Sequence, residues 1–290
     1  MTSADDYPPQ PEAPEPIAAS QTVEPAQEPP ALMKRAVPED LRVPWGWIDL
    51  LLFVVIAFFG TLVLGVALVI GFHLLGASRE QAQRFFGERT SVSVLLQIAL
   101  DFALLGFLAL QVRLRFHAPF WRTIGWRPLE TGGRSRGRTV LLLILAGLAL
   151  DVVVTLASAI SPPKQELPIE ALFRDTRTAI LFMLVAVVLA PVIEETIFRG
   201  YIYPVLARSW GVPAGVLATG LVFGGLHAPQ LWGGWAQIAA LVIVGVALTL
   251  VRASTRTVVA SFIVHTSYNS FQVLAILIGT HGLRHFPPAH

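Results

Sequence analysis

Long apolar stretches separated by short polar ones dominate this chain between Trp47 and Ile278. Most are close to the length of about 20 residues that an α-helix needs to cross the apolar core of a bilayer. The pattern therefore predicts an all-α fold, a polytopic bundle of about seven membrane helices, with an eighth open because the first stretch is long. The expected segments are 47–75, 92–112, 140–160, 179–207, 212–227, 235–251 and 258–278.

The composition agrees with a membrane protein. Of 290 residues, 54% are apolar and only 14% are charged, and the mean hydropathy is +0.64. The chain contains no cysteine, which excludes disulfides, thiolate metal sites and cysteine nucleophiles. Basic residues cluster between apolar segments and form no basic face, so we expect the lipid bilayer as a partner and no nucleic acid.

The placement of arginine predicts the orientation in the membrane. Seven arginines and a single acid, Glu130, occupy the loop between the second and third segments. Such an excess marks a cytoplasmic loop, so the N-terminus is expected in the cytoplasm. Short loops and an arginine-rich composition favour a bacterial cell membrane. The seven are Arg113, Arg115, Arg122, Arg127, Arg134, Arg136 and Arg138.

Four regions are expected along the chain. Residues 1–40 are rich in proline and glutamate, and a segment with so little apolar surface predicts a disordered cytoplasmic tail. Residues 1–33 contain no lysine or arginine and no apolar core, so they do not resemble a signal peptide. Residues 41–177 are assigned to the N-terminal membrane helices, 178–280 to a membrane core that carries the candidate chemistry, and 281–290 to a second tail. Trp45 and Trp47, at the start of the first segment, suit the headgroup level.

Two adjacent carboxylates, Glu194 and Glu195, lie inside the fourth apolar segment. A charge at that depth is costly and by default indicates a functional site with a partner. On a helix, Glu195 and Arg199 are four residues apart and can pair, whereas Glu194 is rotated by about 100° and lacks that partner. One carboxylate is then balanced, and the other is free for chemistry.

Further polar residues follow in the C-terminal half. Phe223 and His227 are four residues apart at the end of the fifth segment, and His265 and Asn269 are four apart in the seventh. Counted from the expected cytoplasmic ends, Glu194, His227, His265 and Asn269 all lie roughly 14 to 22 Å deep. Three helices could therefore bring these four side chains into one layer.

In type, order and spacing, these residues resemble the motifs of the CPBP family. This family comprises intramembrane proteases related to the CAAX prenyl endopeptidases, together with bacteriocin-processing and immunity proteins. The resemblance covers about residues 178–277, and the N-terminal half resembles the family only as a set of membrane helices. It implies that 178–280 is a catalytic CPBP-type core.

The resemblance also implies a role for each motif residue. Glu194 matches the catalytic glutamate, and His227 matches the histidine that holds the attacking water with it. His265 and Asn269 match residues placed near the oxyanion. The supporting positions are Glu195, Arg199 and Phe223, of which Glu195 and Arg199 are expected to form a mainly structural pair.

Two chemical questions stay open at this stage. Glu194, His227 and His265 can also be interpreted as zinc ligands around an open water position, although the preferred interpretation requires no cofactor. Two other intramembrane acids, Asp101 and Asp151, are expected to form hydrogen bonds between helices or to flank a substrate path.

The function expected from the sequence is an intramembrane endopeptidase acting on membrane-associated peptides or proteins. The chief alternative is a non-proteolytic bacteriocin-immunity or regulatory membrane protein with the same fold. A transporter is a third class, since intramembrane Glu and His also serve as proton relays. Inverted repeats would favour the transporter, and the two halves of the chain show none.

Overall fold

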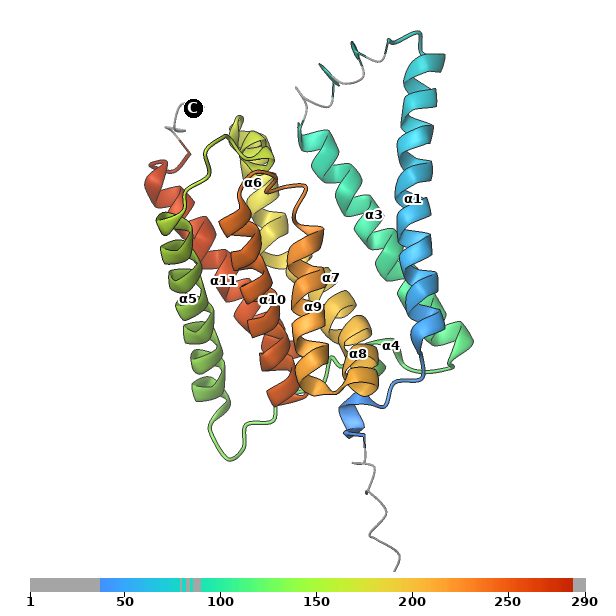
Figure 1. Ribbon diagram of the computed structural model, residues 1–290, viewed down its shortest axis with the longest axis vertical. Helices are drawn as coiled ribbons and strands as arrows, with labels where there is room; N and C mark the ends of the chain where they lie inside the picture. Colours follow the sequence, from blue (N-terminus) through green and yellow to red (C-terminus); the bar gives the residue numbers. More distant parts are fainter. Residues whose placement is uncertain (1–36, 79, 82–83, 86–89, 284–290) are drawn as a thin grey trace, which may run out of the picture. The chain divides into compact units, whose positions relative to one another are not determined.

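Figure 1 shows the computed structural model of the chain, which describes residues 37–78, 80–81, 84–85 and 90–283. The chain divides into two units, 1–36 and 37–290, and every described residue belongs to the second. Most of the predicted tail 1–40, and all but 281–283 of the tail 281–290, lie outside the described residues.

In the described part of the chain, six helices are long and apolar enough to cross a membrane. A seventh apolar helix, α9 (Val212–Leu226), is shorter. The protein is thus an integral membrane protein, and the predicted polytopic helical bundle is confirmed. The six are α1 (Trp47–Leu74), α3 (Thr90–Leu110) continued by the π-helical turn η2 (Gln111–Arg115), α5 (Arg136–Ile160), a composite helix over Thr176–Trp210, α10 (Trp235–Thr255) and α11 (Val258–Gly279).

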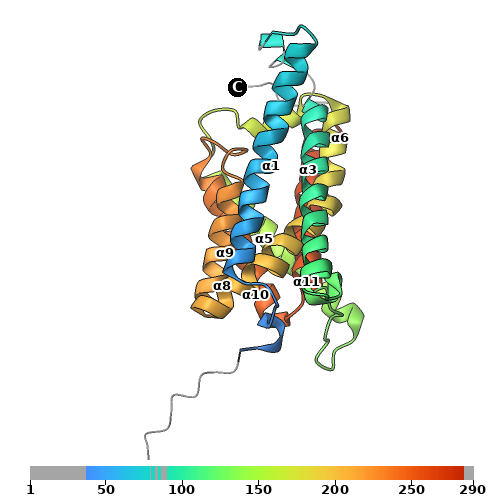
Figure 2. The same ribbon diagram turned by 90° about the vertical axis from the view of Figure 1, so that its right-hand side faces the viewer.

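The helices from α5 onward form the better-packed part of the bundle. Helix α9 packs against both α8 (Tyr203–Trp210) and α10, and α11 packs against α5 and α10 (Figure 1). Helices α1 and α3 contact each other (Figure 2), and their apolar faces are largely exposed. Such exposure is expected for helices that face lipid. Short pieces at the helix ends are η1 (Glu39–Leu41), α4 (Phe120–Thr123) and η3 (Pro168–Phe173).

The composite helix carries both glutamates and is not a regular α-helix. It comprises α6 (Thr176–Leu184), the π-helical η4 (Val185–Leu189), α7 (Ala190–Glu194), the π-helical η5 (Glu195–Ile202) and α8. The Asp175 carboxylate caps its start by accepting from the Thr178 amide. Hydrogen bonds from the Thr178 side chain and then from its amide lower the pKa of Asp175. Gly211, with φ 87°, ends it and allows the turn into α9.

Glycines allow close helix contacts in the core. A Cβ on Gly220 or Gly224 would lie 2.4 Å from a methyl group of Val246 or Val242, respectively, so α9 and α10 approach closely only without one. A Cβ on Gly147 of α5 would likewise lie 2.7 Å from the Val264 carbonyl oxygen of α11. The small residues noted in the fifth segment therefore pack two helices together, as in other membrane bundles.

Residues 37–46, the N-terminal strap, run across one end of the bundle. Trp45 is only 1% exposed, stacks on Tyr201 and donates from its indole nitrogen to the Tyr201 carbonyl at 3.0 Å. Arg208 donates to the carbonyls of Val43 and Trp45, at 2.8 Å each. Trp45 is therefore packed inside the bundle with its polar edge bonded to the composite helix, and its level in the membrane stays a prediction.

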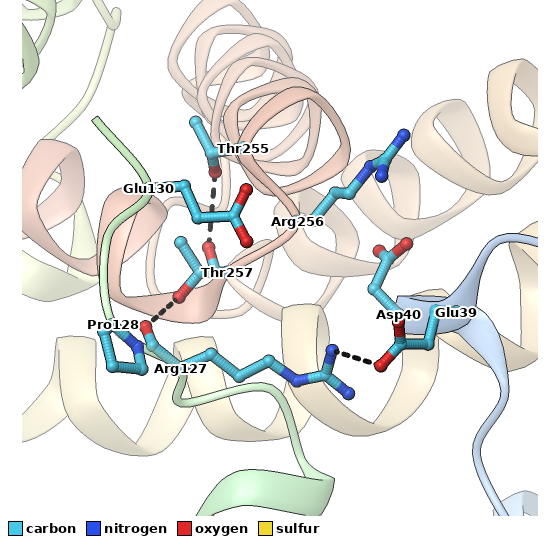
Figure 3. A pocket seen from close by; sticks show the side chains of 8 residues that line it. All are labelled: Glu39, Asp40, Arg127, Pro128, Glu130, Thr255, Arg256 and Thr257. Atoms are coloured by element: carbon cyan, nitrogen blue, oxygen red, sulfur yellow. Dashed lines mark hydrogen bonds and ion pairs between the residues drawn. The ribbon is translucent and has the colours of Figure 1, made fainter. Parts of the chain in front are cut away.

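The strap also borders a small polar pocket at this end of the bundle (Figure 3). Nearby, Asp40 forms an ion pair of 2.7 Å with Arg252, and both side chains are buried. Inside the pocket, the Thr257 hydroxyl donates to the Arg127 carbonyl at 2.6 Å. These bonds join three chain segments at one end of the bundle, and the residues that line the pocket include none of the predicted catalytic residues. The lining is Glu39, Asp40, Arg127, Pro128, Glu130, Thr255, Arg256 and Thr257.

Candidate active site

The structure brings Glu194 together with both predicted histidines. Its Oε1 lies 3.9 Å from Nε2 of His227, and its Oε2 lies 3.8 Å from Nε2 of His265. The three side chains come from α7, the end of α9 and α11. Glu194 and His227 are each about a fifth exposed, at 23% and 22%, whereas His265 is nearly enclosed at 4%. The open side of this cluster therefore lies at Glu194 and His227.

Each histidine ring is fixed through its other nitrogen. Nδ1 of His227 lies 2.7 Å from the Phe223 carbonyl, and Nδ1 of His265 lies 2.9 Å from Oε1 of Glu195. A carbonyl or carboxylate oxygen can only accept, so Nδ1 carries the proton in both rings. This leaves Nε2 of each histidine directed at Glu194, in the manner by which outer hydrogen bonds orient functional imidazoles.

Glu195 and Arg199 form the pair expected from their spacing. Their side chains are fully buried and lie 3.0 Å apart. Arg199 also donates to the Gly245 carbonyl at 2.9 Å, which ties the composite helix to α10. The sequence interpretation missed the second contact of Glu195, with His265. Glu195 therefore balances Arg199 and orients His265 at the same time.

Phe223 packs against the polar groups of the site. Its ring lies 4.8 Å from that of His227 and 5.9 Å from that of His265, measured between centroids. The guanidinium of Arg199 lies 4.5 Å from the Phe223 centroid, within the range of a cation–π contact. The phenyl ring thus limits the freedom of both imidazoles, and its supporting role in the site stays a prediction.

Asn269 makes a different contact. Its side-chain nitrogen donates to the carbonyl of Ala186, in η4, at 2.6 Å. It lies one turn beyond His265 on α11, as expected, but one of its two amide protons is engaged by the backbone of the composite helix. The role near an oxyanion stays a prediction.

The two other intramembrane acids differ in their contacts. Asp151 of α5 accepts from Gln272 of α11 at 2.8 Å, so its predicted interhelical hydrogen bond is confirmed. Asp101 accepts from Gln97, on its own helix, at 2.8 Å. It lies two turns beyond buried Val94, on the same face of α3. A place beside a substrate path remains a prediction for Asp101.

The alternative interpretation from the sequence makes Glu194, His227 and His265 zinc ligands. Within the described residues, no group of three or more His, Cys, Asp or Glu side chains is arranged to hold a metal ion. Glu194 lies 3.8 and 3.9 Å from the Nε2 atoms of His265 and His227. Zinc binding by Glu194, His227 and His265 stays a prediction, which chelation tests.

Comparison with protein families places this cluster in context. Residues 176–271 match the family described as Type II CAAX prenyl endopeptidase Rce1-like. The match supports assignment of this segment to the CPBP/CAAX protease family. It runs from the start of the composite helix into α11, and so contains every residue of the cluster. No curated protein and no solved structure matched the chain.

For the CAAX protease segment, the resemblance seen in the sequence is confirmed at the level of the family. The match supports a membrane-embedded enzyme that hydrolyses peptide bonds.

Thr266, next to His265, was not predicted as a site residue, although its hydroxyl donates to the carbonyl of Val187 in η4. A polar side chain on the same face of α11 as Asn269 was the available signal.

Proposed function

We propose that this protein is an intramembrane endopeptidase in which Glu194 activates a water molecule for attack on a peptide bond. The observation that carries the proposal is the convergence of the Nε2 atoms of His227 and His265 on the two oxygens of Glu194. The separations exceed direct hydrogen bonds, which suits groups that act together on a molecule held between them. The substrate is a membrane-associated peptide or protein.

Glu194 is the general base in the proposed reaction. It takes a proton from the water as the water oxygen attacks the carbonyl carbon, and it later returns the proton to the leaving amine. His227, with its Nε2 lone pair free, accepts a hydrogen bond from the same water. Arg199 neutralises Glu195, so Glu194 is the member of the glutamate pair without an arginine partner.

His265 is proposed to stabilise the oxyanion. Because its Nδ1–H is directed at Glu195, Nε2 can donate only when the ring carries both protons. A preorganised donor of this kind contributes roughly 3 to 4 kcal/mol to the transition state in other hydrolases. The remaining amide proton of Asn269 is the second candidate donor.

Cleavage of a peptide library by the purified protein tests the function directly. We expect the substrate peptides to be cleaved at one defined bond, and we expect this cleavage to require Glu194. A folded preparation that cleaves no member of a library spanning apolar and amphipathic sequences would favour the immunity or regulatory alternative.

Chelation tests the role of metal. If Glu194 is the base and no metal takes part in the reaction, activity after incubation with 1,10-phenanthroline and dialysis should stay within about twofold of the untreated protein. A loss of activity that added zinc restores would contradict the metal-free reaction. A known zinc endopeptidase treated in parallel confirms that chelation was complete.

The orientation predicted from arginine placement is tested by single cysteines, since the chain has none of its own. Ser254, in the last turn of α10, and Ser161, just beyond α5, are both exposed. The C-terminal ends of α10 and α5 lie at opposite ends of the bundle (Figure 1). In intact cells, a membrane-impermeant maleimide should label Ser161→Cys and should label Ser254→Cys only after permeabilisation. The reverse pattern would place the N-terminus outside.

A further inference from the structure

A proline lies three residues before the proposed catalytic glutamate. Pro191 has no N–H, so the carbonyl that would accept from residue 191 loses its backbone donor. In an α-helix that carbonyl belongs to Val187, and in a π-helix it belongs to Ala186. The helix is π-helical just before this point, because the Ala190 amide donates to the Val185 carbonyl, five residues back.

Both affected carbonyls accept from α11 instead. The Thr266 hydroxyl donates to the carbonyl of Val187, and the Asn269 side chain donates to the carbonyl of Ala186. Thr266 and Asn269 are three residues apart and thus lie on one face of α11. Two side chains therefore replace the donor that Pro191 lacks. In an apolar environment an unsatisfied carbonyl is strongly unfavourable, so a replacement donor is needed here.

The π-helical turn sets the direction of Glu194. A π turn accommodates one residue more than an α turn, and one residue corresponds to about 100° around the helix axis. If η4 relaxed to a regular α-helix, α7 would rotate by about that angle relative to α6. Glu194 could then no longer face His227 and His265 while α6 kept its packing against α3.

We propose that Thr266 is a positioning residue which, together with Asn269, holds η4 in its π-helical form and so aims Glu194 at the two histidines. The inference rests on the proposed function, because the aim of Glu194 matters through the water that it activates. Thr266 acts through the backbone of the composite helix and does not touch the substrate. Asn269 has the same structural role whether or not its second amide proton serves the oxyanion.

Replacing Thr266 by valine and by serine tests the hydroxyl. Thr266→Val keeps the shape and removes the donor, and kcat should fall about tenfold or more with KM within about twofold. Thr266→Ser keeps the donor and should retain at least half of the wild-type kcat. The matched control is Thr219→Val, because buried Thr219 donates only to the Gly215 carbonyl of its own helix. The control should stay within about twofold of wild type.

Hydrogen exchange provides a measurement that does not depend on proteolysis. Amide exchange over residues 190–194 should be about tenfold faster in Thr266→Val than in the wild type, Thr266→Ser or Thr219→Val. In a Pro191→Ala background the restored amide can satisfy Val187, so Thr266→Val should then change exchange less than about twofold. This interaction between positions 191 and 266 is specific to the proposed replacement of a donor.

The outcomes separate this inference from the proposed function. If the wild type cleaves no peptide, the proposed function fails, and the exchange data alone decide whether Thr266 holds η4. If the wild type is active, equal losses of kcat in Thr266→Val and Thr266→Ser overturn the inference. It is also overturned if Thr266→Val and Thr219→Val behave alike, or if exchange responds to Thr266→Val equally with and without Pro191.

Discussion

Glu194→Gln and His227→Ala are each expected to abolish proteolysis while leaving the protein folded. Glutamine has nearly the size of glutamate but cannot take a proton from water, and alanine removes the Nε2 atom that lies 3.9 Å from Glu194. We expect kcat/KM to fall at least about 100-fold in each variant, a loss of about 2.7 kcal/mol of transition-state stabilisation. The measurement is cleavage of one defined peptide by purified protein.

Exposed residues of the same types serve as controls. Glu170, in η3, and His73, in α1, are exposed. Glu170→Gln and His73→Ala should keep activity within about twofold, and all four variants should elute and unfold like the wild type. If Glu194→Gln or His227→Ala kept more than about a tenth of the activity, less than ~1.4 kcal/mol would be lost. The assigned roles would then be wrong.

The membrane helices could be predicted from the sequence to within a few residues. The expected segments 47–75 and 212–227 correspond to α1 (Trp47–Leu74) and α9 (Val212–Leu226). Such segments are set by local composition, because a bilayer requires a minimum apolar length and excludes charges. The largest differences are at polar helix ends, such as the start of α5 at Arg136, where the apolar stretch begins only at Val140.

The different roles of Glu194 and Glu195 could also be predicted from their spacing relative to Arg199. Neighbouring residues on a helix are about 100° apart, so Glu194 does not share the face on which Glu195 and Arg199 lie. The structure pairs Glu195 with Arg199, as expected. The contact between Glu195 and His265 was not accessible. It depends on how α11 packs against the composite helix, and these residues are 70 positions apart.

The two π-helical segments of the composite helix were also beyond sequence analysis. Hydrophobic periodicity cannot distinguish a π turn from an α turn within an apolar segment. Pro191 was a visible signal of irregularity, but its consequence depends on donors that Thr266 and Asn269 supply from α11. The precise aim of Glu194 is therefore a tertiary property.

Removing either member of the Glu195–Arg199 pair is expected to destabilise the fold strongly. Both side chains are fully buried and 3.0 Å apart, so each single substitution leaves one charge without its partner in an apolar region. Breaking a buried pair in this way typically costs about 3 to 5 kcal/mol. Glu195→Gln and Arg199→Met should therefore lower the free energy of unfolding, measured by denaturant titration in mixed micelles, and should reduce expression. The exposed pair Glu166–Arg174, at 2.8 Å, is the control, and Arg174→Met should cost less than about 1 kcal/mol.

Exchanging the two charges separates pairing from orientation. The double variant Glu195→Arg with Arg199→Glu restores opposite charges at the same two positions, so it should recover part of the stability lost in Glu195→Arg or Arg199→Glu alone. It should not recover proteolysis, because an arginine at position 195 cannot accept the Nδ1–H of His265. In the wild-type structure, Nδ1 of His265 lies 2.9 Å from Oε1 of Glu195. A double variant no more stable than the worse single variant would contradict pairing. Recovery of full activity would contradict the orienting role of Glu195, because His265 would then need no acceptor at that position.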